Sequence, residues 1–309
     1  AWDVDPNRVE ILDQAATRAR INVRNVMGGF VVHGQARVQP AKRVRGLAAA
    51  VERLGVPIYE QATVSAIAKG SVTTDRGTVR AETIIRATEG FTAGIPGEER
   101  TWLVLNSAQI VTEPLSPELW RQIGWEGHEL LGNAAHAYCY AQRTREGRIT
   151  MGGRGVPYRY GSRTDVKGQT QQATIDQLHQ ILTTLLPQTA SCRIEHAWCG
   201  VLGVPRDWCT TVGLDTATRI GWAGGYVGLG VSSSNLSGRT LADLILGQDT
   251  ELTKLPWVNR KVRPWEPEPF RWLGVHSMYQ LYRMADEREF AGLPKTSKLA
   301  ALADGITGH

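Results

Sequence analysis

The chain has 309 residues, of which 42% are hydrophobic and 21% charged, a composition typical of folded globular proteins. Its net charge of +5 comes from basic residues scattered among acidic ones, which argues against a nucleic-acid-binding surface. No apolar run is long enough to span a membrane and residues 1–7 form no apolar leader, so we expect a cytoplasmic protein without membrane contact.

The first third of the chain alternates between helical and strand patterns. Apolar spacing predicts a helix over residues 5–20 and a glycine-flanked strand over 28–35. A second helix is predicted over 41–54, because Pro40 precedes its first turn and Gly55 follows its end. Strands are predicted after it at 56–59, 63–67, 71–74, 77–80 and 81–87, with a hairpin turn at 75–77.

The rest of the chain is richer in long strands. Strands are predicted at 103–112, 137–143, 148–152, 192–198 and 219–223. A helix over 170–186 ends before Pro187, and a last strong helix ends near Gly247. The tail from residue 255 is rich in Pro and Trp and becomes amphipathic near 278–284. The order of elements predicts an α/β fold with a mixed sheet.

Residues 224–235, with the sequence GGYVGLGVSSSN, form the most informative segment. They stand between a short apolar run and a helical pattern, and such a strand–glycine–helix order brings backbone N–H groups against a polar cofactor at a helix N-terminus. Glycine permits positive φ and close approach because it has no Cβ. An ordinary connection between a strand and a helix is the alternative interpretation of this segment.

Four cysteines stand singly in apolar or aromatic surroundings, at positions 139, 192, 199 and 209. No pair has zinc-site spacing, so we expect buried free thiols and no metal site. Ten tryptophans suit a flat apolar ligand pocket, although large cores use tryptophan as well.

Several segments match one family in order and spacing. They are PAK at 40–42, YEQATV at 59–64, TDRGTVRAETIIRA at 74–87, VTEPL at 111–115, GGRG at 152–155 and AGGYVG at 223–228. Together these resemble the FAD-dependent oxidoreductases of the glycine oxidase/D-amino-acid oxidase (DAO) family, and most closely its γ-glutamylputrescine-oxidase-like bacterial members. The resemblance covers residues 25–290 and implies an FAD/NAD(P)-binding-type fold with a mixed-sheet substrate domain.

One family feature is missing. Such enzymes begin with a strand, a GxGxxG turn and a helix that hold the FAD pyrophosphate, and no GxGxxG occurs in this sequence. We therefore expect the N-terminal Rossmann βαβ unit to be absent. Three explanations remain open: a fragment, a split enzyme whose N-terminal unit is supplied by a partner chain, or a relative that has lost normal FAD binding.

The resemblance also implies a domain division. Residues 1–39 and 101–191 would form the substrate domain, and 40–100 with 192–250 would form the remaining FAD-binding domain. Residues 251–309 would be a C-terminal extension. On the cofactor side, Val64 resembles the position whose backbone faces the adenine, and Ala87 and Thr88 resemble the turn near the pyrophosphate. The loop that meets the flavin pyrimidine edge would be formed by Gly225, Tyr226, Val227, Gly228 and Leu229.

On the substrate side, the resemblance implies that Tyr138, Tyr140, Arg154 and Trp198 line the space over the isoalloxazine ring. Arg154 could hold a substrate carboxylate in a bidentate fork, or it could be a surface arginine beside a glycine turn. Thr150 stands where sarcosine-oxidase relatives carry a lysine, so a dehydrogenase is as plausible as an oxidase. Cys199 lies near the position where some relatives attach flavin, but a structural thiol is the simpler interpretation.

The resemblance therefore implies flavin-dependent oxidation of a small amine or amino acid, by hydride transfer from a C–H bond beside nitrogen to FAD. The alternative is a flavin-free binding or scaffold protein, or one subunit of a complex, that retains the DAO-like fold. The glycine turn at 224–230 favours the first function, and the missing GxGxxG favours the second.

Overall fold

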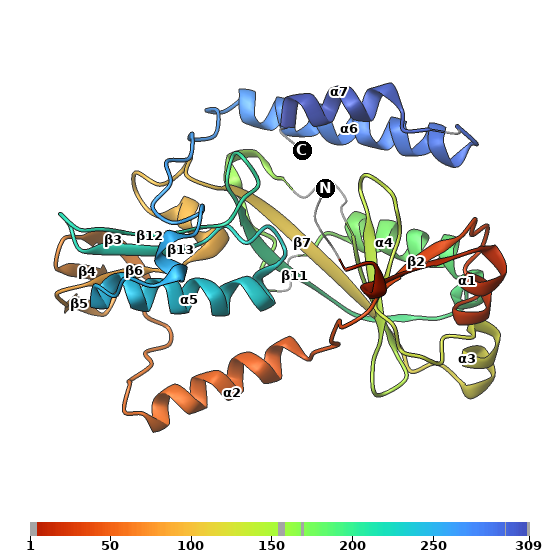
Figure 1. The fold of residues 1–309 in the computed structure, drawn as a ribbon, viewed down its shortest axis with the longest axis horizontal. Helices are drawn as coiled ribbons and strands as arrows, with labels where there is room; N and C mark the ends of the chain where they lie inside the picture. The colour runs from red at the N-terminus through yellow and green to blue at the C-terminus, as the bar shows by residue number, and fades with distance from the viewer. Residues whose placement is uncertain (1–4, 154–157, 168–169, 294, 308–309) are drawn as a thin grey trace. The chain divides into compact units, whose positions relative to one another are not determined.

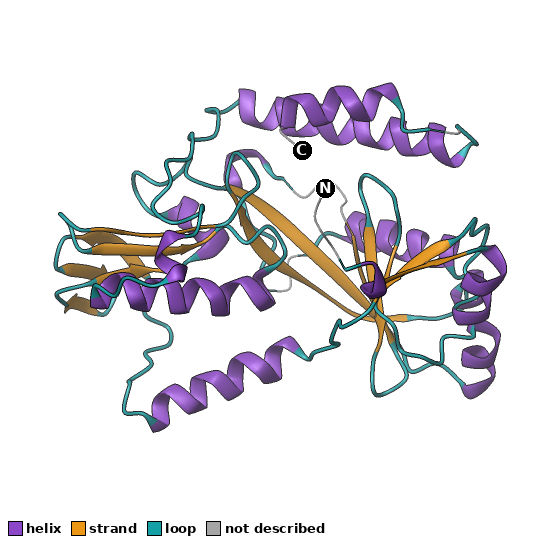
Figure 2. Ribbon diagram, in the orientation of Figure 1, coloured by secondary structure: helices purple, strands orange, loops and turns teal. Residues whose placement is uncertain are grey.

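A computed structural model describes residues 5–153, 158–167, 170–293 and 295–307. The chain forms two compact units. The first comprises residues 1–39, 107–155 and 166–199, and the second comprises 40–106, 156–165 and 200–309. Figure 1 labels most of the helices and strands, and Figure 2 distinguishes helices from strands by colour. Among the described residues, no helix is both long and apolar enough to cross a membrane.

The first unit opens on a small hairpin. A 3-10 turn, η1 (Pro6–Arg8), leads into β1 (Val9–Leu12), which pairs antiparallel with β2 (Gly29–Val32). Helix α1 (Gln14–Arg20) begins only where the Asp13 side chain accepts a hydrogen bond from the amide of Ala16. The predicted helix over 5–20 is therefore wrong for its first half, because cross-strand pairing of Ile11 with Phe30 replaces helical spacing.

A five-stranded sheet has the order β11-β7-β10-β9-β8. Its strands are β7 (Leu103–Thr112), β8 (Leu131–Gly132), β9 (Cys139–Arg143), β10 (Ile149–Gly153) and β11 (Ile194–Val204). The remaining elements near it are α3 (Pro117–Ile123), α4 (Gln172–Leu185) and the 3-10 turn η4 (Pro187–Thr189). Strands β7 and β11 each continue from residues of one unit into residues of the other.

The core of the first unit forms where α4 meets the sheet. Leu178 and Leu182 of α4 are buried together with Ile110, Ile149 and Met151 of the strands. Helix α4 ends at Leu185, before Pro187, as the sequence predicted. Burial of these side chains is the main stabilising contribution here, at about 1.5–3 kcal/mol for each large aliphatic residue.

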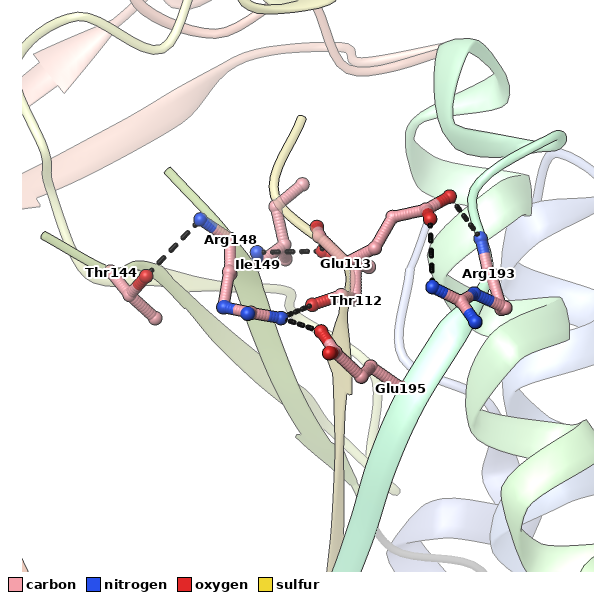
Figure 3. Close-up of polar contacts among 7 residues, drawn as sticks. All are labelled: Thr112, Glu113, Thr144, Arg148, Ile149, Arg193 and Glu195. Carbon is pink, nitrogen blue, oxygen red and sulfur yellow. Dashed lines mark hydrogen bonds and ion pairs between the residues drawn. The ribbon is translucent and has the colours of Figure 1, made fainter. Parts of the chain in front are cut away.

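Polar contacts fix the ends of the central strands (Figure 3). The Arg148 guanidinium donates to the carbonyl of Thr112 at 3.0 Å and forms an ion pair with Glu195. The Thr112 hydroxyl accepts from the amide of Ile149 at 3.0 Å, and Glu113 accepts from the amide of Arg193 at 2.9 Å. These contacts hold β7, β10 and β11 in register at the end of the sheet that carries Thr150.

The second unit contains a three-stranded sheet of order β12-β13-β6. Its strands are β6 (Ile84–Arg86), β12 (Thr211–Asp215) and β13 (Ile220–Gly224), and β13 runs parallel to β6 and antiparallel to β12. Helix α5 (Gly230–Leu246) follows β13, and its Leu241 is buried with Val212 and Ala223 of the sheet. The unit also contains the 3-10 turns η2 (Glu89–Gly94), η3 (Tyr160–Ser162) and η5 (Glu251–Lys254).

The outer edge of β12 is closed by the chain that follows α5. Val258 forms a parallel bridge with Val212, and the amide of Asn259 donates to the Val212 carbonyl at 2.9 Å. The Asn259 side chain then accepts from the amide of Leu214 at 2.8 Å. Residues 257–259 thus satisfy backbone groups that an edge strand would otherwise expose.

A second, antiparallel sheet contains β3 (Val64–Ala68), β4 (Ser71–Thr74) and β5 (Gly77–Arg80), which confirms the predicted hairpin. Helix α2 (Pro40–Arg53) begins at the predicted proline and contains no buried residue. The predicted strand at 56–59 is wrong, because these residues form no ladder. Ile58 and Tyr59 are exposed, so their apolar character reflects no pairing.

Two helices complete the second unit. Helices α6 (Phe270–Phe290) and α7 (Lys298–Thr307) lie side by side in Figure 1. The predicted amphipathic segment at 278–284 lies within α6. Val275 of α6 joins a core formed by Leu103, Leu105, Tyr158, Val204 and Trp265. Tyr158 also donates to Glu268, whose carboxylate accepts from the amides of Gly161 and Trp272.

The cysteines differ from the expected uniform burial. Cys139 and Cys192 are buried, and desolvation raises the pKa of the Cys139 thiol to about 11. Cys199 is half-buried and Cys209 is exposed. Cys209 was expected in the core because of its apolar neighbours, but it follows the exposed Asp207 in the connection before β12.

Candidate functional site

The parallel pairing of β6 and β13 sets the candidate site in the second unit. Ile84 pairs with Ile220 and Arg86 with Trp222, so both strands end at the same edge of the sheet. Ala87 and Thr88 follow β6, and the segment from Gly225 to Leu229, here called the glycine loop, follows β13. Ligands of α/β folds bind at the carboxyl ends of parallel strands, where such loops meet.

A carboxylate links the two loops. Glu89, the first residue of η2, accepts hydrogen bonds from the amide N–H groups of Gly225 at 2.7 Å and Tyr226 at 3.2 Å. Burial raises the pKa of the Glu89 carboxyl, although hydrogen bonds from Gly225, Tyr226 and Gly203 act in the opposite direction. Sequence reasoning did not identify Glu89, since a single glutamate after a strand carries no distinctive pattern.

The glycine loop adopts backbone angles that side chains disfavour. Gly225 has φ of 68°, Val227 has 52° and Gly228 has 93°. A β-branched residue with positive φ is a genuine outlier, and such strain costs about 1–3 kcal/mol. Val227 is held there because its side chain packs against the core that contains Leu103 and Val204.

One side of the glycine loop is filled and the other is open. A Cβ on Gly224 would lie 2.5 Å from the Trp102 ring, and one on Gly225 would lie 2.5 Å from Pro205. A Cβ on Gly228, in contrast, would meet no atom within 4 Å. The loop therefore rests on Trp102 and Pro205, and its backbone is accessible at Gly228.

The backbone amides of the glycine loop also fall into two groups, those with a hydrogen-bond acceptor and those without one. The amides of Gly225 and Tyr226 donate to Glu89, and that of Leu229 donates to the carbonyl of Tyr226 at 2.9 Å. Within the described part of the chain, no acceptor is recorded for the amides of Val227 and Gly228. They precede the N-terminus of α5, whose dipole favours negative charge. The arrangement can bind an anionic or carbonyl-bearing edge of a planar ligand, and in this respect it fits a flavin.

The segment after β6 is different in character. Arg86 is buried, its guanidinium lies 5.2 Å from the centre of the Trp102 ring, and it pairs with Glu98 at 3.4 Å. Desolvation lowers the pKa of Arg86, while Glu98 acts in the opposite direction. Ala87 is exposed, and the Thr88 hydroxyl contacts that of Thr92 at 2.8 Å.

Val64 does not belong to the sheet that contains β6 and β13. It is the first residue of β3, in the separate antiparallel sheet, and pairs with Thr74. No contact recorded among the described residues joins it to the glycine loop. Its expected backbone role is thus neither supported nor opposed by the pairing.

The expected substrate-side residues belong to the first unit. The rings of Tyr138 and Tyr140 lie 6.4 Å apart, and the Tyr140 hydroxyl is 3.1 Å from that of Ser107. Tyr140 faces Gly152 across the strand pair, and a Cβ on Gly152 would lie 2.5 Å from its ring. The glycine therefore makes room for the tyrosine ring.

Trp198 is not next to these tyrosines. It lies on β11, which is separated from β9 by β7 and β10, and its ring stacks on His196 at 6.0 Å. His196 is exposed on this strand. Thr150 pairs with Val111 and Gln142 inside the sheet. Arg154 lies outside the described residues. No group of three side chains suited to a metal ion occurs in the part of the chain that the structure describes.

Comparison with known proteins gives one consistent result. The sequence profile of a family described as FAD dependent oxidoreductase (DAO) matches residues 1–244. The chain is 27% identical over 257 residues to "Probable oxidoreductase OrdL" of Rhizobium meliloti (strain 1021), covering 80% of this chain and 56% of the relative. It is 26% identical over 253 residues to "Gamma-glutamylputrescine oxidoreductase" of Escherichia coli (strain K12), covering 80% and 57%.

Solved structures agree on the fold. Glycine oxidase from Geobacillus kaustophilus superposes with a TM-score of 0.67 at 17% identity, over 82% of this chain and 67% of that one. L-proline dehydrogenase from P. horikoshii gives 0.65 at 16% identity, over 79% and 66%. The chain spans less than two thirds of the length of the curated relatives, at 56% and 57% for the two named above.

Proposed function

Because the chain belongs to the family of FAD-dependent oxidoreductases, we propose that it oxidises a small amine or amino acid with FAD as cofactor. The observation that carries this proposal is the glycine loop, with two amide donors beside an accessible Gly228 at the carboxyl edge of β6 and β13. FAD in such a site would accept a hydride from the C–H bond beside the substrate nitrogen, which leaves an imine.

The chain's own residues would supply binding and orientation. The amides of Val227 and Gly228, with the α5 N-terminus behind them, would stabilise negative charge on the flavin edge. Ala87 and Thr88 would lie near the pyrophosphate, and Val64 near the adenine. The exposure of Ala87 and the position of both residues at the shared strand edge are compatible with these roles for Ala87 and Thr88.

The substrate would contact the aromatic side chains. Tyr138 and Tyr140, whose ring planes are inclined at 51°, would form an apolar wall that excludes water, and Trp198 on β11 would lie outside this wall. Similar proteins named for glycine, L-proline and iminodiacetate act on compounds that carry a carboxylate. A small amine bearing a carboxylate is therefore the substrate class that we favour, with Arg154 as its binding residue.

The proposed role of Arg154 can be tested with a pair of ligands. Arg154→Lys should weaken binding of an amino acid by about 1.5–3 kcal/mol, since an ammonium cannot reproduce the planar fork. Binding of the corresponding decarboxylated amine should barely change. Isothermal titration of both ligands against both variants measures this, and equal losses for the two ligands would contradict the role.

A partner that completes the cofactor site is part of the proposal. Strand β6 lies at one end of the order β12-β13-β6, and its Ile85 is 50% exposed. Parallel sheets are normally covered on both faces, and an edge strand exposes N–H and C=O groups that a further strand can pair with. Helix α2 exposes Val44 and Leu47 and buries no residue, and Leu54, directly after its end, is exposed as well. A partner chain that carries a βαβ unit with GxGxxG would fit both surfaces.

Titration with FAD, followed by its visible absorption and fluorescence, tests the proposal. Because pyrophosphate without a glycine turn is poorly bound, we expect weak FAD binding to the 309-residue chain and tighter binding when the βαβ unit is supplied. A colourless protein that binds no FAD under either condition would support the second candidate, a flavin-free binding or scaffold protein. The two amides already taken by Glu89 are the observation in favour of that candidate.

A further inference from the structure

We infer that Glu89 is a positioning residue for the glycine loop: it fixes the amides of Gly225 and Tyr226 and thereby presents those of Val227 and Gly228 to the ligand. The second half of this statement rests on the proposed function, because it concerns the same loop. The first half concerns only the chain itself and can be tested without cofactor.

The carboxylate of Glu89 occupies a space that two glycines leave free. A Cβ on Gly203 of β11 would lie 3.1 Å from Oε2 of Glu89, and a Cβ on Gly224 of β13 would lie 3.0 Å from it. Either side chain would be tighter than ordinary contact. The Trp102 ring lies nearer still to both positions, at 2.9 Å for Gly203 and 2.5 Å for Gly224. The two glycines, at the ends of separate strands, therefore make room for this ring and for the Glu89 carboxylate together.

The contact acts on the two residues just before the strained position. Oε2 accepts from Gly225 at 2.7 Å and Oε1 from Tyr226 at 3.2 Å, so both carboxylate oxygens are engaged. Val227 follows immediately with φ of 52° and is packed into the core. Strained backbone persists only when its surroundings over-determine it, and here one side is held by Glu89 and the other by packing.

Glu89 is itself held in an uncommon conformation. Its φ is 44°, in the left-handed region, directly after Thr88. The ionisable groups around the contact are the Tyr226 phenol on the loop, and Arg86 and Glu98 on either side of Glu89 in sequence. Burial and the Glu89 charge both raise the pKa of Tyr226. Arg86 is paired with Glu98, so its charge is not committed to Glu89.

Hydrogen exchange at the amides of Gly225 and Tyr226, measured on the full chain without cofactor, tests the first half. Glu89→Ala should speed exchange at both amides by about tenfold or more, because each loses its carboxyl acceptor. Glu89→Gln, which retains one carbonyl oxygen, should have a smaller effect and keeps the test valid if the alanine variant fails to fold. Glu99→Gln is the matched control, since this exposed carboxylate accepts from the Gly97 amide, away from the glycine loop.

The pH dependence of amide protection distinguishes positioning by the Glu89 carboxyl from a general loss of structure. Since burial raises the pKa of Glu89, the closed loop holds its proton more tightly than the open loop, and protection should fall as the pH rises above 4.5. In Glu89→Gln the protection, taken as the ratio of the intrinsic to the observed exchange rate at each pH, should not change over this range. Wild-type rates in both variants, or an unchanged pH profile in Glu89→Gln, would overturn the inference.

FAD titration of the same variants, with the βαβ unit supplied, decides the second half. A positioning role predicts weaker FAD binding in Glu89→Ala and no change in Glu99→Gln. If the wild type binds FAD and Glu89→Ala binds it equally well, Glu89 does not position the loop for a flavin. If the wild type binds none, the proposed function fails, while the exchange rates still decide what Glu89 does to the loop.

Discussion

At the scale of single residues, Gly228 is the glycine among those at 224, 225 and 228 that combines a positive φ with open space at its missing Cβ. Its φ of 93° disfavours any side chain, and the space beyond it is open. Gly224 and Gly225 would clash with Trp102 and Pro205, so their replacement disturbs packing as well as any ligand. Gly228 is therefore the position where ligand binding can be separated from folding.

Gly228→Ala should abolish or strongly weaken FAD binding while lowering stability only by the backbone strain, about 1 kcal/mol. Gly55→Ala is the matched control, because Gly55 has φ of 85° and nothing within 4 Å of its missing Cβ. Thermal unfolding and FAD titration of both variants measure the two effects. Unchanged FAD affinity in Gly228→Ala would mean that the glycine loop has only a structural role.

A second residue-scale prediction concerns pH. The Arg260 guanidinium hydrogen-bonds to Asp207 and holds the pKa of this carboxyl below 3.8, although burial acts in the opposite direction. A lowered carboxyl pKa contributes stability above 3.8 that is lost as the pH falls through the folded-state value. Asp207→Asn should therefore cost about 0.5–1 kcal/mol at pH 7, a modest value because the pair is partly exposed.

Thermal unfolding of Asp207→Asn at neutral and at acidic pH checks this expectation. The difference from wild type should shrink as the pH is lowered below 3.8. Asp249→Asn removes an exposed partner of Lys254 and serves as the control, with little effect throughout. A deficit in Asp207→Asn that stays constant with pH would show that the loss is one of packing and not of charge.

At the scale of elements, the helices differ in what they bury. Leu182 of α4 is fully buried, whereas Leu47 of α2 is 65% exposed. Leu182→Ala should destabilise the chain by about 2–5 kcal/mol through the cavity that it leaves. Leu47→Ala should change stability by no more than about 0.5 kcal/mol. Urea unfolding of both variants measures this, and equal losses would mean that α2 is packed in solution.

Sequence reasoning succeeded for elements with a long, one-sided pattern. The strand over 103–112 and the helices near 41–54 and 170–186 were found because their apolar spacing and proline positions are unambiguous. It missed β1 because four residues give no clear period, and β12 because the short run TVGLD resembles a loop. Helix α6 was only partly found, since apolar residues such as Leu273 and Phe290 lie at exposed positions and blur its apolar periodicity.

The candidate site could be predicted only where it is formed by residues that are neighbours in sequence. The glycine loop could be found because a strand, glycines and a helix follow one another in sequence. Glu89 could not, because its function depends on the pairing of β6 with β13, more than 130 residues apart. Likewise, the separation of Trp198 from Tyr140 depends on the strand order, which residue patterns do not reveal.

At the scale of the whole molecule, the exposed apolar residues have a consequence for solution behaviour. Val44 and Leu47 on α2 and Leu54 directly after its end form an exposed apolar stripe, and the net charge of +5 offers little repulsion between copies. We expect the chain without a partner to self-associate as its concentration rises. Light scattering should detect this as an increase in apparent mass.

The double variant Val44→Lys/Leu47→Lys should suppress that self-association without loss of stability. Val79→Lys, which changes an exposed apolar residue of β5 outside the stripe, is the control and should leave the apparent mass unchanged. Association that persists in the double variant would show that another surface is responsible.

The closure of β12 by residues 257–259 bears on how shorter versions of this protein should be designed. The family profile ends at residue 244, close to the end of α5, and would suggest a boundary there. A chain cut at that point would lose the Val258 bridge and both Asn259 hydrogen bonds. The bare strand would then offer its N–H and C=O groups to neighbouring molecules, as amyloid-forming edges do. A chain that ends where the family profile ends is therefore shorter than the chain that the fold of this sheet requires.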